Sequence, residues 1–339
     1  MKHLHSFFCY LILFSSVALM PWRADASPVY GDVNGSEDVN IADVISLIDH
    51  MLNGETTIRD DVDGNIEVNI ADATCLIDYL LGGELKFDLY YPPVPDSALV
   101  ITVKGVSFAM MPVQGGSFYP HYSSASPSTL NDYYVGMTEV TMELWEAVMG
   151  SRPISAMRYK AKPNQPVDCP TWWECKDFIA KLNELTGLEF HMPTHDQWEY
   201  AAMGGHLTHG YIYSGSEDID EVGWYDGNRP AIFERYYQNW ANSYTLPVGM
   251  KKPNELGIYD MTGNVREWLE ASSPGWGEYY RTLNPEDNNT FCTDLIGGSN
   301  RQIASECTIY SRMWTLTPNT TATDAGFRLA LQASSLNRK

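Results

Sequence analysis

Two stretches near the N-terminus carry oxygen-bearing side chains at the same spacing. DVNGSEDVNIAD starts at Asp32, and DVDGNIEVNIAD starts at Asp61. Such side chains occupy positions one, three, five, nine and twelve of each stretch, and the backbone carbonyl of position seven adds a further oxygen. Hard oxygen ligands at this alternate spacing wrap a calcium ion. The predicted ligands are Asp32, Asn34, Ser36, Asp38, Asn40 and Asp43 in the first loop and Asp61, Asp63, Asn65, Glu67, Asn69 and Asp72 in the second.

A helix has to follow each loop to hold its last ligand in place. Apolar residues recur at helical spacing after both loops, and the predicted helices end at Gly54 and Gly83. Their apolar stripes are Val44, Leu47, Ile48 and Met51, then Ala73, Leu76, Ile77 and Leu80. The alternative is a pair of metal-free turns, because Asn and Asp favour turns in any case. Two copies in register favour calcium.

Residues 30–83 resemble a type I dockerin over their whole length. Both loops end in Asp where an ordinary EF-hand has Glu, and no helix obviously precedes them, although Glu37 and Ile66 replace the usual glycine at loop position six. The resemblance implies a small all-α module that folds around calcium and binds a cohesin-bearing partner. It also implies partner contacts at loop positions ten and eleven, which are Ile41, Ala42, Ile70 and Ala71. These residues could equally cap the small core.

A second stretch whose residues could take part in chemistry is GGSNRQIASEC near the C-terminus, which contains Ser299 and Cys307. A thiol can act as a nucleophile or bind a soft metal, but no histidine lies near Cys307 in the sequence to serve as its base. A serine in a Gly-Gly-Ser turn is more often structural. We therefore expect Cys307 to be a small buried residue or half of a disulfide, most simply with Cys292.

The composition of the chain disfavours some classes of partner and indicates where the protein acts. The 339 residues have a formal net charge of -21, which disfavours nucleic acid and anionic membrane surfaces as partners. Residues 1–26 have the basic start, apolar run and small-x-small ending of an export signal, and we see no later transmembrane segment. The protein is predicted to be secreted. Removal of the signal leaves an odd number of cysteines, so at least one thiol is free or intermolecular.

The rest of the chain divides into a linker, a large domain and a tail. Residues 84–98 contain Pro92, Pro93 and Pro95 and predict an extended, semi-rigid spacer. Residues 99–332 predict an α+β domain rich in loops, with helices at TMELWEAVMG, WWECKDFIAKLNELTG and THDQWEYAAMGG. Residues 333–339 form the tail.

The large domain resembles the formylglycine-generating enzyme family, also called sulfatase-modifying factors. MPTHDQWEYAA, GIYDMTGNVREW and a terminal GFRL occur in the family's order, and similar segments cover nearly all of residues 99–332. The resemblance implies a modified C-type-lectin-like fold. It also implies a calcium site formed by the side chains of Asp260 and Glu267 and the carbonyls of Gly263 and Val265. In the alternative, Asp260 and Glu267 only cap turns.

The family's oxidases convert a substrate cysteine to formylglycine, using oxygen and a copper(I) ion held by two cysteines after the Gly-Gly-Ser turn. Here the first cysteine position is Gln302 and the second is Cys307, while Arg266 replaces an active-site tryptophan. An amide is a poor ligand for copper(I) compared with a thiolate. The sequence therefore predicts that the oxidase chemistry is lost.

The favoured hypothesis is a secreted, dockerin-tethered protein whose large domain binds an extracellular ligand, with glycan as one candidate. The stretch from Asn300 to Ala325 is the predicted ligand surface, because related folds bind ligands there and Arg, Tyr and Trp dominate binding hot spots. The predicted contacts are Arg301, Tyr310, Arg312 and Trp314. The alternatives are a copper-dependent oxidase that recruits a distant second cysteine, and a purely structural scaffold component.

Overall fold

The computed structural model describes residues 31–36, 38–56, 60–63, 67–83, 89–123, 125–153, 162–229, 245–270, 293–315 and 318–338. The predicted signal peptide, Asn65, Cys292 and the side chain of Trp314 lie outside the described residues. Within them, no helix is long and apolar enough to cross a membrane.

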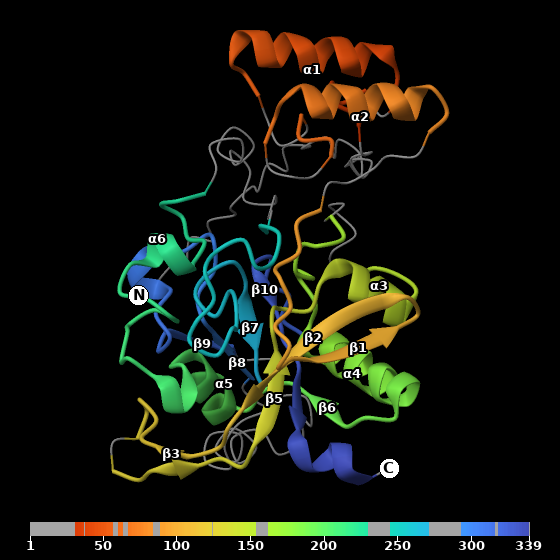
Figure 1. Cartoon of the computed structure of the whole chain (residues 1–339). Helices are drawn as coiled ribbons and strands as arrows, with labels where there is room; N and C mark the ends of the chain where they lie inside the picture. The colour runs from red at the N-terminus through yellow and green to blue at the C-terminus, as the bar shows by residue number, and fades with distance from the viewer. Residues whose placement is uncertain are drawn as a thin grey trace, which may run out of the picture.

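Two helices lie side by side at one end of the molecule (Figure 1), α1 (Ile41–Asn53) and α2 (Ile70–Leu80). Each begins with an Asn whose side chain accepts a hydrogen bond from the helix N-terminus. The carboxylate of an Asp three residues later accepts from the backbone N–H of that Asn. The core between them consists of Val33, Val44, Leu47, Val62, Ala73 and Leu76. α1 stops before Gly54 as predicted, whereas α2 stops at Leu80, earlier than predicted.

Two of the eight residues in the predicted apolar stripes face away from the core. Ile48 and Ile77 are exposed, as is Leu52. Two short helices bury only a narrow seam between them, so the flanking apolar residues are left on the surface.

A five-stranded antiparallel sheet forms the first layer of the large domain. Its order is β1-β2-β5-β11-β6. The strands are β1 (Leu99–Val103), β2 (Val106–Val113), β5 (Tyr133–Gly136), β6 (Phe190–His191) and β11 (Ala330–Gln332). β11 comes last in the chain but pairs between β5 and β6, so the C-terminal segment completes the sheet (Figure 1).

A second sheet, of order β10-β7-β8-β9, carries the segments that the sequence singled out. Its strands are β7 (Arg266–Trp268), β8 (Thr293–Ile296), β9 (Arg312–Thr315) and β10 (Ala325–Gly326). β10 runs parallel to β7, and the other neighbours are antiparallel. A short hairpin pairs β3 (Ser117–Phe118) with β4 (Ser128–Thr129).

The helices of the large domain begin where threonine side chains cap them. α3 (Met142–Met149), α4 (Trp172–Thr186) and α5 (His195–Ala202) start after Thr141, Thr171 and Thr194, and α6 (Ile219–Val222) is a single turn. In the core between α3, α4 and the C-terminal segment, Trp145 stacks on Phe178, and Phe327 packs edge-on against both rings. Short 3₁₀ turns are η2 (Gly205–Leu207), η4 (Ala304–Glu306) and η5 (Ala333–Arg338), so the predicted tail begins as a helical turn.

The second half of the predicted linker lies against the large domain. The Asn164 amide donates to the carbonyl of Tyr90 at 3.0 Å, and Pro92 packs on Gly249, where a Cβ would come within 2.4 Å of the proline ring. Together with β1, β2 and the start of α3, this segment encloses a cavity of about 210 Å³. Residues 89–98 are therefore a docked strap rather than a spacer.

Candidate functional site

The Gly-Gly-Ser turn after β8 places Cys307 directly beneath it. Gly297 and Gly298 have φ values of 91° and 75°, a region that glycine adopts without a steric penalty. A Cβ on Gly298 would lie 2.6 Å from both the Cα and the Sγ of Cys307. The turn and η4 are thus packed together at the position of the family's metal-binding cysteines.

Cys307 is a fully buried, free thiol. Its Sγ donates to the carbonyl of Ser299 at 3.4 Å, and burial raises the pKa of the thiol to about 12. Cys307 is therefore a small buried residue, as one of the two expectations had it, whereas Cys292, the suggested disulfide partner, lies outside the described residues. A thiol with this pKa is almost entirely protonated at neutral pH and is a weak nucleophile.

Ser299 and Arg266 share one carboxylate. The Ser299 hydroxyl donates to Oδ2 of Asp324 at 2.7 Å, and the Arg266 guanidinium pairs with Oδ1. The backbone N–H of Arg266 also donates to the carbonyl of Asp324. This network joins β7, the Gly-Gly-Ser turn and the segment before β10, so both side chains are engaged in holding the fold.

Glu267 lies at the centre of the domain and accepts four hydrogen bonds. Three come from Nε and Nη2 of Arg328 at 2.6 to 2.9 Å, and one comes from Nε1 of Trp198 at 2.7 Å. Arg328 also donates to the carbonyls of Gly136 and Tyr259. The predicted calcium ligand Glu267 is thus neutralised by a protein cation.

Asp260 lies near Glu139, a second buried acid. Oδ2 of Asp260 accepts from the backbone N–H of Gly249 at 2.6 Å. Burial raises the pKa of Asp260 to about 6. Burial also raises the pKa of Glu139 well above its usual value, and the charge of Asp260 adds to that shift. The calcium site predicted at Asp260, Gly263, Val265 and Glu267 stays a prediction, and an ion there would have to compete with Arg328 for Glu267.

The predicted ligand contacts separate into two places. Arg301 donates to Thr323 beside the Ser299 network. Tyr310 stacks on His121 with ring centroids 4.5 Å apart, and Arg312 pairs with Asp294 at 2.5 Å.

Sequence reasoning missed four residues that lie around Tyr310. His121 and Tyr122 follow β3, and His195 and Glu199 lie on α5. Tyr122 packs edge-on against His195 at 4.9 Å and donates to Asp196. The run YPHYS between β3 and β4 was the available signal, because exposed aromatic residues gathered in one loop are typical of binding surfaces.

Beneath this aromatic cluster lies a buried acid–base pair. Oε2 of Glu199 is 3.5 Å from Nδ1 of His195, and Oε1 accepts from the backbone N–H of His121 at 2.6 Å. Burial raises the pKa of Glu199 to about 7. Burial, together with the charge of Arg312, lowers the pKa of His195 to about 4. The pair is therefore largely uncharged in weak acid.

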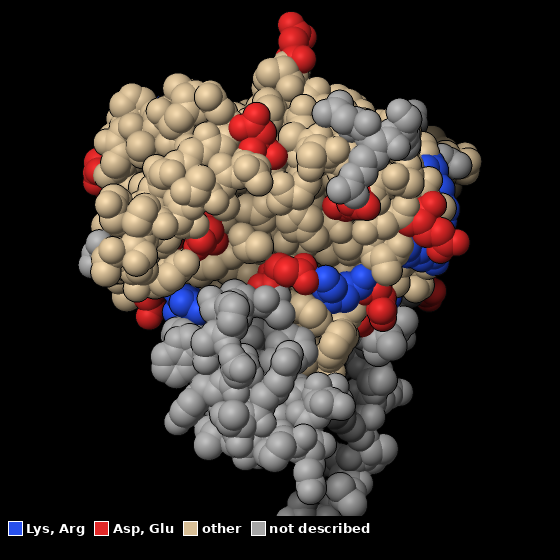
Figure 2. Space-filling view, turned by 90° about the horizontal axis from the view of Figure 1, so that it is seen from below, with Lys and Arg blue, Asp and Glu red and all other residues tan. Residues whose placement is uncertain are grey.

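The face at the β3 end of the domain is mainly uncharged. Figure 2 shows this face, with acidic side chains set apart from one another and basic ones toward its edge. The described part of this face thus offers no continuous charged area, despite the acidic balance of the whole chain. Such a face suits a neutral ligand better than a polyion.

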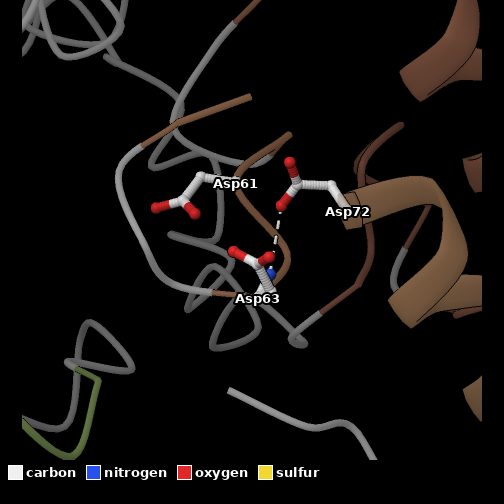
Figure 3. A group of neighbouring side chains, drawn as sticks. All are labelled: Asp61, Asp63 and Asp72. Carbon is white, nitrogen blue, oxygen red and sulfur yellow. Dashed lines mark hydrogen bonds between the residues drawn. The ribbon is translucent and has the colours of Figure 1, made fainter. Parts of the chain in front are cut away.

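The second loop of the N-terminal module brings three carboxylates together. Oxygens of Asp61, Asp63 and Asp72 approach within 4.8 Å of one another (Figure 3), the one such group of three among the described residues. Asp72, in the first turn of α2, accepts from the backbone N–H groups of Val62 and Asp63. Burial, with the charge of Asp61, raises the pKa of Asp72. This donor set fits a hard divalent cation.

The first loop has a related arrangement. Asp43 accepts from the backbone N–H groups of Asn34 and Asn40, and Asp32 accepts from Ser36. The predicted partner residues at loop positions ten and eleven are exposed in both repeats, with Ile41 at 63% and Ile70 at 71%. They do not cap the module's core.

The large domain has the sequence pattern of a known family. The model of the sulfatase-modifying factor enzyme 1-like domain matches residues 97–333. The chain belongs to this family. Its relatives include the chaperone protein LppX of Paenibacillus barcinonensis, 35% identical over 209 residues, which are 48% of this chain and 71% of that protein.

The formylglycine-generating enzyme of Streptomyces coelicolor is 28% identical over 184 residues, 51% of this chain and 54% of that enzyme. Among solved structures, Treponema denticola variable protein 1 is 25% identical with a TM-score of 0.53, covering 70% of this chain and all of that one. PvdO from Pseudomonas aeruginosa, at 19% identity and a TM-score of 0.52 over 70% of this chain and all of its own, shares the fold.

Proposed function

We propose that the large domain is a non-catalytic member of its family that binds an extracellular ligand, and that the N-terminal module tethers it to a partner. The observation that carries this proposal is the state of Cys307. It is a buried, protonated thiol, and Gln302 stands where the oxidases have their first cysteine.

The site lacks the pair of thiolates that the oxidases require to hold copper(I). Two thiolates hold copper(I), whereas here the one sulfur is a protonated thiol without charge and the other position is a hard amide. Arg266 and Ser299 are tied to Asp324 instead of facing a substrate. The chaperone and the variable protein among the relatives are not named for cysteine oxidation, which supports a family member without that reaction.

A competition assay for copper(I) tests the loss of oxidase chemistry. The mature chain and its Cys307→Ser variant are titrated against a colorimetric copper(I) chelator. We expect neither to compete. Tight binding that disappears in the variant would overturn the proposal and support the copper-dependent oxidase, which a cysteine-peptide oxidation assay would then examine.

The ligand surface is proposed at the aromatic cluster around Tyr310. His121, Tyr122 and Tyr310 offer rings for stacking, and the Asp196 carboxylate beside Tyr122 can accept hydrogen bonds, which suits a hydroxyl-rich ligand such as a glycan. Binding to a glycan panel is expected to weaken at least tenfold in Tyr310→Ala. Tyr79→Ala, an exposed tyrosine on α2 of the N-terminal module, is the control. Equal loss in both variants would argue against this surface.

The N-terminal module is proposed to be a calcium-dependent dockerin that binds a cohesin. Calcium would be held by the loop residues predicted above and would hold each loop closed against its helix. The three converging carboxylates and the two exposed, matching apolar faces support this assignment. Calorimetric titration of the mature chain with calcium tests it, and two binding events that Asp43→Asn and Asp72→Asn each reduce to one are expected.

A further inference from the structure

One short segment of the large domain contacts both the N-terminal module and the strap. Nζ of Lys162 donates to the carboxylate of Asp61 at 2.5 Å and to its backbone carbonyl at 3.1 Å. Two residues later, Asn164 donates to Tyr90 of the strap. Lys162 is only 7% exposed and Asp61 only 3%, so this contact is buried.

Asp61 is also one of the three converging carboxylates of the second loop. Oxygens of Asp61, Asp63 and Asp72 lie within 4.8 Å of one another, so the loop carries a charge repulsion that a cation would relieve. In this structure the cation that reaches the loop is the Lys162 ammonium of the large domain. Part of the negative charge of the second loop is therefore already neutralised by a residue of the same chain.

We propose that Lys162 and calcium oppose each other at Asp61, so that occupancy of the second loop controls how the module docks on the large domain. This rests on the calcium binding proposed above. An ammonium at the carboxylate relieves the repulsion that calcium would otherwise relieve, and two cations that share one carboxylate repel each other. By linkage, docking weakens calcium binding by the same factor by which calcium weakens docking.

The two repeats provide an internal comparison. The matching residue of the first loop, Asp32, accepts from the backbone N–H of Ser36 within its own loop. Among the described residues, the Lys162 ammonium donates to Asp61 of the second loop. The proposed coupling therefore concerns the second loop, and the first loop serves as its comparison in the titration.

Calcium titration of the full mature chain tests the coupling. In Lys162→Met, the affinity of the second loop should rise roughly tenfold, within the usual range of coupling between two sites, while the first loop is unchanged. Asp72→Asn and Asp43→Asn, each combined with Lys162→Met, assign the two binding events to their loops. Lys181→Met is the matched control, because that ammonium donates to the carbonyl of Met149 within the large domain.

Small-angle X-ray scattering gives a second readout. The wild-type chain should extend when calcium is added, and Lys162→Met should be extended both with and without calcium. Calcium binding with the same second-loop affinity in wild type and Lys162→Met overturns the coupling alone. Absence of any calcium binding in the wild type overturns the calcium proposal, and the coupling with it.

Discussion

At the scale of single residues, burial decides which groups keep their reactivity. Cys307 occupies a position at which the family's oxidases bind copper, yet its thiol is covered by the Gly-Gly-Ser turn. The residue type was visible in the sequence. The raised pKa was not, because it depends on how closely Gly298 packs on the sulfur.

Alkylation of the native protein should therefore spare Cys307. With a pKa of about 12, roughly one thiol in ten thousand is ionised at pH 8. We expect Cys307 to react with iodoacetamide at least a hundredfold more slowly in the native state than in urea, as measured by peptide mass spectrometry. Rapid native labelling would show an accessible thiolate and would contradict the burial.

Glu199 and His195 should have opposite effects on the pH dependence of stability. The pKa of Glu199 is raised from 4.5 to about 7, so its contribution is present below pH 4.5 and is lost as the pH rises through 7. The pKa of His195 is lowered from 6.5 to about 4, so its contribution is present above pH 6.5 and is lost as the pH falls through 4. Between pH 4.5 and 6.5 the changes that Glu199 and His195 cause in the free energy of unfolding nearly cancel.

Glu199→Gln removes the contribution of Glu199 to the pH dependence of stability. Between pH 4.5 and 7 the free energy of unfolding of the variant should rise relative to wild type by on the order of 2 kcal/mol, since Gln cannot ionise. Urea denaturation at several pH values measures the difference. A difference that does not change with pH would show that Glu199 titrates normally.

At the scale of elements, tight turns and helix caps follow from local sequence, whereas partners across the fold do not. The helices that start after Thr141 and Thr194 were predicted correctly, because a helix cap lies within three residues of its donors. The stacking of Tyr310 on His121 was not predicted, because no local pattern links residues so far apart in the chain. The same reason hid Arg328 as the partner of Glu267.

The Gly-Gly-Ser turn should tolerate no side chain at its second glycine. Gly298→Ala adds the cost of a left-handed conformation to a close contact with the backbone of Cys307, and should destabilise the domain by about 2–4 kcal/mol. Gly105→Ala is the control, since its φ is 88° but a Cβ there meets nothing within 4 Å. Similar urea midpoints for the two variants would contradict the close packing at Gly298.

At the scale of the whole molecule, one buried ion pair links segments from across the large domain. Arg328 contacts Glu267 on β7, Gly136 at the end of β5, and Tyr259. The strap and the Lys162 contact extend this connection toward the N-terminal module. The domain boundaries could be estimated from composition. The contacts that join the N-terminal module, the strap and the large domain could not, because they are single contacts between residues distant in the sequence.

Breaking that ion pair should be the most damaging single change. Arg328→Met leaves Glu267 charged and buried, and a loss of about 3–5 kcal/mol in the free energy of unfolding is expected. Glu221→Gln removes an exposed partner of Lys252 and should cause little measurable change. Comparable thermal shifts in both variants would contradict the central role of Arg328.

The late position of Arg328 and β11 in the chain has a consequence for the order of folding. β11 pairs between β5 and β6, which cannot join without it, and Arg328 is the cation that neutralises Glu267. Helices α3 and α4 can form early, since their contacts are local, but the sheet and the buried acid both wait for residues 325–332. Folding of the large domain should therefore end in one late cooperative step that depends on this segment.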